Sequence, residues 1–453
     1  MLLVHGASVL RYDRLAMCGI AGIISLDGTP PDRQALERMT LDVAHRGPDG
    51  HGISIRASVG LGHRRLAIVD LSDDGLQPLE SADGRLAITF NGEIYNYLEL
   101  REELRGLGHS FRTATDTEVL LAAYLQWGER CVDRFNGMWA FAIHDAHAHT
   151  VFCSRDRFGV KPFYFARLGN RIAFGSEIRQ LLPLLPAVRA DRQTLEEFLF
   201  MGVDEPIVRT FFEGVEKLPG GYSLLIDLDR GTAVVQRQYE IARRPDSRDQ
   251  CVSSRGRQVS TASILMSLFI QGSPSIAYFK FWLRARWMRK APPLPEYVRT
   301  EAAAMYGLVD IQRFDIERAN LPALLRFEDK NSMHFAVETR LPFLDWRSVE
   351  AALSLPAEAK FHKGWTKWLL RKAMASRLPQ EVTWRRWKIG FEAPAATWMR
   401  LHADRMQEAV QQSALIGELA RPGWLARHYK SMHAATRWRL YSVAMWERVF
   451  NVG

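Results

Sequence analysis

The residues best suited to covalent chemistry begin at Cys18, which follows Met17 and opens the apolar, glycine-bearing run Gly19–Gly22. A lone Cys in such a run is ordinarily a small buried hydrophobe. If Met17 is the initiator and is removed, Cys18 carries both a thiol and a free α-amine. That amine titrates with a pKa of about 7.7–8.0, so at neutral pH it can accept the proton of its own thiol. The sequence therefore offers a nucleophile and its base within one residue.

Four polar segments follow Cys18 and supply the other residue types that amide hydrolysis requires. The Asn91 side-chain amide and the Gly92 backbone N–H are two donors for the negative oxygen of a tetrahedral intermediate, and glycine permits close backbone approach. Each segment has an ordinary structural explanation when taken singly, as a hairpin turn, a surface charge or a helix cap. Their joint occurrence behind Cys18 favours catalysis. The segments are His45–Gly50, Gly62–Leu66, Asn91–Asn96 and Thr115–Glu118.

In these motifs the chain resembles the glutamine-hydrolysing asparagine synthetases, which have an N-terminal-nucleophile glutaminase domain. The resemblance covers Met17 to Phe212 and resumes from Asn320 to about Trp398. It implies that Arg65 binds the carboxylate of glutamine and that Glu93 and Asp116 bind its ammonium. The catalytic residues that it implies are Cys18, Asn91 and Gly92, and the substrate-binding residues are Arg65, Asn91, Glu93 and Asp116.

The resemblance also implies the fold class. We expect an α+β N-terminal domain, a two-sheet αββα sandwich, followed by a mostly helical remnant of an α/β ATP-pyrophosphatase-like domain. Residues 1–17 form an extra segment, for which a misassigned start is preferred and a propeptide is the alternative. Residues 18–230 form the glutaminase domain, 231–276 a junction, and 277–453 the C-terminal part of the synthetase domain.

Apolar periodicity and capping residues predict the elements of this first domain. A helix capped by Asp32 should carry Leu36 and Met39, and a second helix over 118–127 should be capped by Asp116 or Thr117. A strand through Leu86, Ile88 and Phe90 should end at Asn91. Further strands are expected at 19–24, 138–143, 151–154, 161–166, 171–175 and 223–227, and helices at 277–290, 348–353 and 365–376.

The second stretch of resemblance includes Glu338–Asp345 and Gly364–Trp368 and implies adenylation of aspartate by ATP. That chemistry requires a glycine-rich pyrophosphate loop at a helix N-terminus and an acidic segment for magnesium. Neither motif is found, so the simplest interpretation is an internal deletion centred on residues 242–275. Lys367 matches the phosphate-facing lysine of the family, with Arg371 on the same helical face; a solvated basic face is the alternative.

Composition limits the other functional classes. The formal charge is +9, with basic clusters at 284–290 and 384–388 that we interpret as faces of amphipathic helices rather than nucleic-acid contacts. The four cysteines, which are Cys18, Cys131, Cys153 and Cys251, form no CxxC pair and fit free thiols in a cytoplasmic protein, with Cys131 and Cys153 buried and inert. The longest apolar run, Ile264–Ile270, is too short to span a bilayer.

The sequence therefore predicts a glutamine-dependent asparagine synthetase that converts ATP, aspartate and glutamine to asparagine, glutamate, AMP and pyrophosphate. ATP and Mg²⁺ are the expected cofactors, bound at a site that is incomplete here, and no protein metal site is expected. The expected partners are glutamine and aspartate or a related acceptor, without nucleic acid or membrane, and a homodimer is left open. The alternatives are a stand-alone glutaminase and a non-catalytic remnant or binding protein.

Overall fold

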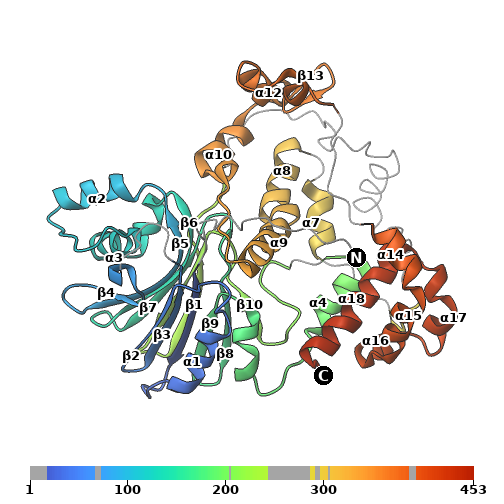
Figure 1. Ribbon diagram of the computed structural model, residues 1–453, viewed down its shortest axis with the longest axis horizontal. Coiled ribbons are helices and arrows are strands. Elements are labelled where there is room, and N and C mark those ends of the chain that lie inside the picture. The colour runs from blue at the N-terminus through green and yellow to red at the C-terminus, as the bar shows by residue number, and fades with distance from the viewer. Residues whose placement is uncertain are drawn as a thin grey trace, which may run out of the picture.

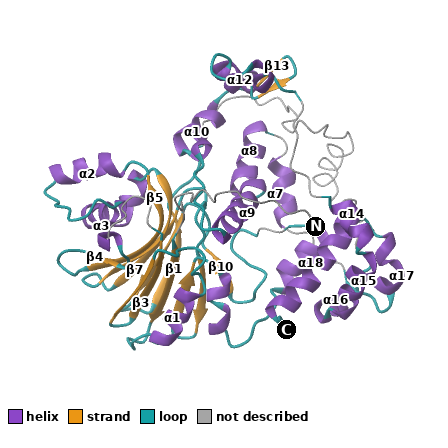
Figure 2. Cartoon of the chain, in the orientation of Figure 1, coloured by secondary structure: helices purple, strands orange, loops and turns teal. Residues whose placement is uncertain are grey.

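The computed structural model describes residues 18–66, 73–203, 206–242, 286–290, 296–304, 307–386 and 394–453. We call residues 18–242 the N-terminal half and residues 286–453 the C-terminal half. Two sheets dominate the N-terminal half, and helices make up most of the C-terminal half (Figures 1 and 2).

The first sheet has six strands in the order β10-β8-β9-β1-β3-β2, and its described pairings are antiparallel. Strand β1 lies inside the sheet and is fully buried, because its Ala and Ile side chains pack against apolar neighbours on both faces. The strands are β1 (Gly19–Ser25), β2 (Gly50–Arg56), β3 (Val59–Arg65), β8 (Tyr164–Leu168), β9 (Arg171–Gly175) and β10 (Val215–Lys217).

The second sheet also has six strands, in the order β12-β11-β7-β6-β5-β4, and its pairings are likewise antiparallel. Strands β5 and β6 form the longest pairing, from Leu86 opposite Asp145 to Ile94 opposite Gly137. The strands are β4 (Leu79–Glu80), β5 (Leu86–Ile94), β6 (Gly137–Asp145), β7 (Thr150–Arg155), β11 (Tyr222–Asp227) and β12 (Thr232–Arg237).

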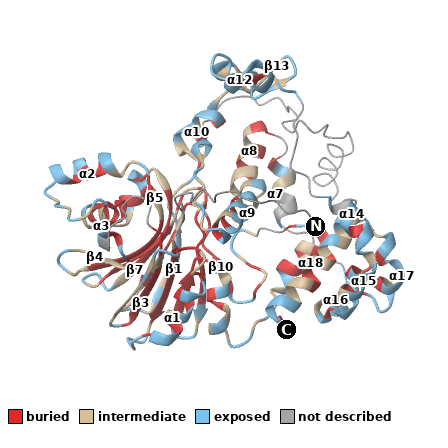
Figure 3. Ribbon diagram, viewed as in Figure 1, coloured by how far each residue is buried: buried red, intermediate tan, exposed pale blue. Residues whose placement is uncertain are grey.

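The two sheets pack face to face around a buried apolar layer that includes Ile20, Leu61, Phe174 and Leu224. Helix α1 (Arg33–Leu41) covers the outer face of the first sheet. Helices α2 (Tyr97–Gly106) and α3 (Asp116–Trp127) cover the second sheet (Figure 3). The helix–sheet–sheet–helix order confirms the predicted αββα fold class.

Helix α4 (Arg192–Met201) leaves the sandwich and packs against the C-terminal helices around Leu199, Val410 and Leu440. These helices therefore share a core with the N-terminal half. The C-terminal half contains α7 (Glu296–Ala304), α8 (Leu308–Glu317), α9 (Asn320–His334), α10 (Trp346–Ser354), α11 (Ala357–Lys360), β13 (Phe361–His362), β14 (Trp365–Thr366), α12 (Trp368–Met374), α13 (Gln380–Thr383), α14 (Ala395–Leu401), α15 (Ala403–Gln412), α16 (Ala414–Leu419), α17 (Trp424–His428) and α18 (Ala434–Phe450).

Short 3-10 segments complete the described elements. They are η1 (Asp73–Gly75), η2 (Gly128–Arg134), η3 (Ile178–Gln180), η4 (Leu182–Leu184), η5 (Pro342–Leu344) and η6 (Tyr429–Ser431).

Several predicted boundaries are wrong. Strand β5 continues through Asn91 to Ile94, because the segment pairs with β6 along its whole length. Thr115, rather than Asp116 or Thr117, caps α3 by accepting the Glu118 N–H. Strand β8 begins at Tyr164 rather than at position 161.

Predictions in the C-terminal half also need correction. Residues 286–290 are not helical, and Met288 forms an isolated bridge with Ala420. Within 365–376, Trp365 and Thr366 are strand residues and the helix covers only Trp368–Met374. Residues 384–386 follow α13 outside any helix, so the described parts of both basic clusters are not amphipathic helices. The rest of 277–290 and residues 243–276 of the predicted 231–276 junction lie outside the described residues.

Candidate functional site

Cys18 lies immediately before β1, at the end of the first sheet where Gly19 pairs with Arg64 of β3. This register brings Cys18 and Arg65 together on neighbouring strands. The Cys18 Sγ lies 3.8 Å from the Leu66 carbonyl oxygen, and the side chain packs against Leu66 and Met333. Burial raises the pKa of the Cys18 thiol to about 12, so the thiol requires a base in order to react.

Two hydrogen bonds between the sheets place β5 beside β3. The Thr89 hydroxyl donates to the Gly62 carbonyl at 2.9 Å, and His63 Nε2 lies 3.1 Å from the Phe90 carbonyl. Burial lowers the pKa of His63 to about 3, so the ring is neutral at physiological pH and can donate to this carbonyl. Asn91 and Gly92, which follow Phe90, are thereby held at the same end of the sandwich as Cys18.

The Asn91 side chain has no exposed surface, and neither polar atom of its amide has a hydrogen-bond partner among the described residues. An unsatisfied buried polar group costs about 1–3 kcal/mol, so such a group is expected to have a ligand to bind. The following residue, Gly92, has a φ of 153°. A Cβ at position 92 would lie 2.1 Å from the Met138 carbonyl oxygen. The glycine is therefore required inside a strand, and a hairpin turn at Asn91–Gly92 is excluded.

Two carboxyl groups line the same end. Asp116 accepts the Ile94 backbone N–H at 2.9 Å, and burial raises its pKa to about 6. Burial and the neighbouring Glu338 raise the pKa of Glu93 to about 7. Arg340 Nε lies 2.8 Å from Glu93 and 3.0 Å from Glu338. A guanidinium from the C-terminal half therefore contacts the carboxylate that the family pattern assigns to the ammonium of glutamine.

Arg65 is the last residue of β3 and is buried. A Cβ added at Gly75 would lie 2.4 Å from Arg65 Nη2 and 3.2 Å from the Thr115 methyl group. The guanidinium thus occupies space that Gly75 leaves open, beside the N-terminus of α3. Together these contacts place the six predicted glutamine-site residues at one end of the sandwich.

Gln77 is a site residue that the sequence did not reveal. Its Oε1 accepts the Phe90 N–H at 2.6 Å, and its Nε2 donates to the Thr117 hydroxyl at 3.3 Å. It therefore joins β5, which carries Asn91, to the first turn of α3. In the sequence, Gln77 is marked only by the Pro78 that follows it. This pair has no spacing from the other motifs that would identify Gln77 as a site residue.

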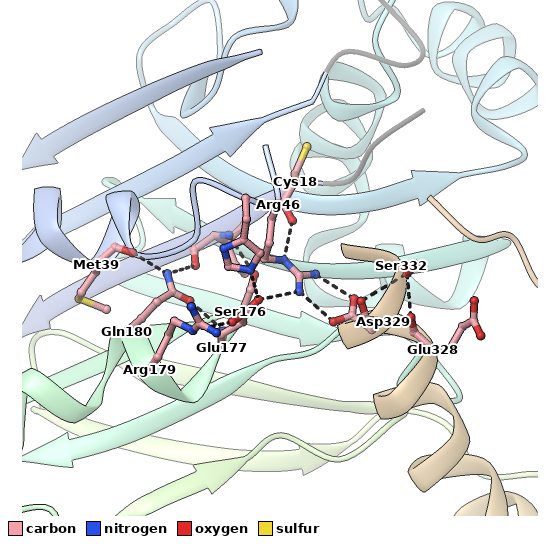
Figure 4. Close-up of polar contacts among 12 residues, drawn as sticks. Cys18, Met39, Arg46, Ser176, Glu177, Arg179, Gln180, Glu328, Asp329 and Ser332 are labelled. Atoms are coloured by element: carbon pink, nitrogen blue, oxygen red, sulfur yellow. Dashed lines mark hydrogen bonds and ion pairs between the residues drawn. The ribbon is translucent and has the colours of Figure 1, made fainter. Parts of the chain in front are cut away.

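Arg46 is a second residue whose position the sequence did not reveal. Its guanidinium is fully buried and donates to both carboxylate oxygens of Asp329 on α9, each at 2.8 Å (Figure 4). It also donates to the Cys18 carbonyl and to Glu177, both at 3.3 Å. With His45 and Arg46, the pKa of Glu177 falls to about 2 despite its burial. The sequence motif His45–Gly50 predicts a functional segment, but Asp329 on α9 lies 283 residues away and no local signal links it to Arg46.

Lys367 stands apart from this site. It is exposed, precedes α12 with a φ of 56°, and belongs to the outlying unit of α11, β13, β14 and α12 (Figure 1). Arg371 does not extend a free basic face, because its Nε donates to the Thr366 carbonyl and its guanidinium lies over the Trp365 ring.

Cys131 and Cys153 are buried free thiols, and burial raises the pKa of both. Cys251 lies outside the described residues.

Two family models match consecutive parts of the chain. The glutamine amidotransferase domain family matches residues 17–240, and the asparagine synthase family matches residues 233–448. The combination defines an amidotransferase domain followed by a ligase domain. Both matches support the resemblance of the chain to the glutamine-hydrolysing asparagine synthetases.

Curated relatives carry the same description. Asparagine synthetase [glutamine-hydrolyzing] 3 of Bacillus subtilis is 38% identical over 218 residues, which cover 47% of this chain and 35% of that protein. A putative asparagine synthetase [glutamine-hydrolyzing] 2 of Methanocaldococcus jannaschii is 40% identical over 237 residues, covering 47% and 45%. The matched regions thus cover between about a third and a half of these relatives.

Among solved structures, the glutamine phosphoribosylpyrophosphate amidotransferase of Bacillus subtilis aligns with a TM-score of 0.37 at 20% identity. The alignment covers 49% of each chain.

No described helix is long and apolar enough to cross a membrane.

Proposed function

We propose that this chain hydrolyses glutamine at Cys18 and supplies the ammonia to a synthetase half of the asparagine synthetase type. The observation that carries the proposal is the buried amide of Asn91, which has no described partner and lies next to the obligatory Gly92. An amide donor and a backbone N–H arranged in this way suit the oxyanion of an acyl-transfer intermediate.

The proposed reaction starts from a Cys18 whose α-amine is free. The amine accepts the thiol proton, and the sulfur attacks the side-chain amide carbon of glutamine. Asn91 Nδ2 and the Gly92 N–H hold the resulting oxyanion. Protonation of the leaving nitrogen releases ammonia and leaves a thioester, which water hydrolyses to glutamate. Arg65 orients the substrate carboxylate, and Glu93 and Asp116 orient its ammonium.

For the C-terminal half, the asparagine synthase match supports ATP as a substrate and aspartate as the acceptor. We further propose Mg²⁺ as the metal ion that accompanies ATP. The described residues do not fit an ATP–Mg²⁺ site. Lys367 is exposed on an outlying unit, and no group of three His, Cys, Asp or Glu in the described ranges could hold a metal ion. We therefore derive no adenylation step from them.

A stand-alone glutaminase is the second candidate function. Its support is that the glutamine-site residues are assembled at one end of the sandwich, whereas Lys367 lies apart from them. Glutamate release measured with and without ATP, aspartate and Mg²⁺ distinguishes the candidates. Asparagine formation supports the synthetase, and ATP-independent glutamate release without asparagine supports the glutaminase. Loss of glutamate release in Cys18→Ala is expected for both candidates, and retained glutamate release in that variant would contradict the proposed nucleophile.

A further inference from the structure

The end of α9 is held against the glutamine site at two points. Asp329 pairs with the buried Arg46 (Figure 4). One turn later, Met333 packs beside Cys18. After the helix the chain turns at Ala336, whose φ is 54° and whose N–H donates to the Met333 carbonyl. Helix α9 therefore ends beside the proposed nucleophile.

The segment that follows α9 is held again a few residues later. The side-chain amide of Asn136, which immediately precedes β6, donates to Asp345 at 3.0 Å. Glu338 and Arg340 lie between this contact and the end of α9. Two polar side chains of the C-terminal half therefore belong to a segment that the N-terminal half holds at both ends.

These two side chains meet Glu93 of the glutamine site. Arg340 Nε lies 2.8 Å from Glu93 Oε2 and 3.0 Å from Glu338 Oε1. The exposed fraction is 13% for the Glu93 side chain and 4% for that of Glu338, whereas Arg340 is 52% exposed. Two nearly buried carboxyl groups thus lie next to one guanidinium, where water screens their interactions only weakly.

The guanidinium is not shared equally between the two carboxyl groups. Its Nε–H donates a hydrogen bond to Glu338, whereas the buried Glu93 Oε2 has no hydrogen-bond partner among the described residues. A buried acceptor without a donor is unfavourable, so this oxygen is expected to have a ligand to bind. Glu338 therefore takes the N–H of Arg340 and leaves an oxygen of Glu93 available to the substrate ammonium.

The charges of both neighbours also act on Glu93. Burial and the Glu338 carboxylate raise the pKa of Glu93 to about 7, and Arg340 opposes this rise. A carboxyl group with a pKa near neutrality changes its charge readily when either neighbour is lost. The other titratable groups near this carboxyl pair are Asp116, Tyr95 and Lys161.

We propose that Glu338 and Arg340 of the C-terminal half are positioning residues of the glutamine site, which act on the substrate through Glu93. Glu338 holds the Arg340 N–H away from Glu93, and Arg340 keeps Glu93 ionised beside a second carboxylate. Glutamine binding then depends on both halves of the chain. This inference rests on the proposed function, in which Glu93 binds the ammonium of glutamine.

The test is isothermal titration of glutamine into the full chain carrying Cys18→Ala, which should bind glutamine without hydrolysing it. Titrations from about pH 5 to 9 give the midpoint of the change in Kd with pH. The substrate is the same throughout, so a difference in midpoint between variants reports on Glu93 and its neighbours. Glu338→Gln and Arg340→Gln are the two variants, and circular dichroism checks that each is folded.

Two further variants are the controls. Arg340→Lys keeps the positive charge at the site. Arg105→Gln removes an arginine of matching exposure, because the Arg105 side chain on α2 is 51% exposed and pairs with Glu102. Both controls should keep the midpoint of the parent chain.

The parent midpoint is expected near pH 7, because the pKa of Glu93 is about 7. Loss of the neighbouring carboxylate in Glu338→Gln should lower the midpoint by about one pH unit. Loss of the cation in Arg340→Gln should raise it by about one pH unit and weaken binding at pH 7 about fivefold, because less Glu93 is ionised there.

Opposite shifts separate an electrostatic role from a structural one, because a loss of local packing would change both variants in the same direction. Unchanged midpoints in the folded variants, shifts in the same direction, or no glutamine binding at any pH would each overturn the proposal. Glutamate release by the parent chain is assayed separately. Release together with unchanged midpoints overturns this inference alone, whereas the expected shifts in a chain that releases no glutamate overturn only the proposed hydrolysis.

Discussion

At the scale of single residues, the candidate oxyanion site depends on two neighbouring residues, Asn91 and Gly92. Asn91 places a polar amide in a buried position without a described partner, and Gly92 adopts a backbone conformation that a side chain would obstruct. Both features oppose stability and both suit an oxyanion, which is the pattern expected where function constrains the fold.

Gly92→Ala should abolish glutamate release and destabilise the chain. The added Cβ would overlap the Met138 carbonyl oxygen, and the positive φ adds strain, for a total cost of roughly 2 kcal/mol or more. Thermal unfolding and glutaminase assays check this. Gly106→Ala is the control, because a Cβ there meets nothing within 4 Å. Full activity in Gly92→Ala would show that this backbone does not form the oxyanion site.

The two acidic residues predict a pH dependence of the KM for glutamine. Glu93 has a pKa of about 7 and Asp116 of about 6, so both are largely protonated below about pH 5 and both are largely ionised above about pH 8. The substrate ammonium stays charged across this interval, so KM should fall as the pH rises from about 5.5 to 8. Glu93→Gln should raise KM at pH 8 and reduce its change with pH. A KM that rises with pH would contradict this assignment.

At the scale of elements, the order of segments was predictable and the contacts between them were not. The buried run after Cys18, the cap at Asp32 and the strand through Phe90 all carry local signals in the sequence. The position of Arg46 depends on Asp329, which lies 283 residues away, and a single sequence holds no local sign of such a pair. The family pattern predicts a site at Asn91 and Gly92, but it could not show that β5 continues through them.

Asp329→Ala tests the link between α9 and the nucleophile strand. It would leave the buried Arg46 with a weaker set of partners, and breaking a buried pair typically costs about 3–5 kcal/mol. Chemical denaturation of the variant should show a loss of this order. Asp133→Ala provides the comparison, because its ion pair with Arg130 spans 3.7 Å at the surface and should contribute less than about 1 kcal/mol. Similar losses in the two variants would show that the interface does not depend on this pair.

At the scale of the whole molecule, the C-terminal half has two parts with different packing. Its last helices share a core with α4, and Ile416 and Leu440 have no exposed surface. Helix α12 has no buried residue, and Leu369 and Leu370 are 48% and 42% exposed. The sequence did not predict the core that α4 shares with the last helices.

Limited proteolysis should therefore cut the unit of α11, β13, β14 and α12 before it cuts residues 18–242. Exposed apolar surface on this unit should also promote association of the chain at high concentration. Mass spectrometry of the fragments and light scattering measure these outcomes. Initial cleavage within β1–β9, with residues 357–386 intact, would contradict this order of stability.

The most direct test of the central claim combines N-terminal sequencing and intact mass with glutamate release on one sample. A chain that begins at Cys18 should release glutamate from glutamine, Cys18→Ala should release none, and Asn91→Ala should lose roughly 10²–10³ in kcat. The free α-amine is required, so a chain that retains residues before Cys18 should be inactive until they are removed. A homogeneous chain that begins at Cys18 and releases no glutamate, or a Cys18→Ala variant that still does, would contradict the account.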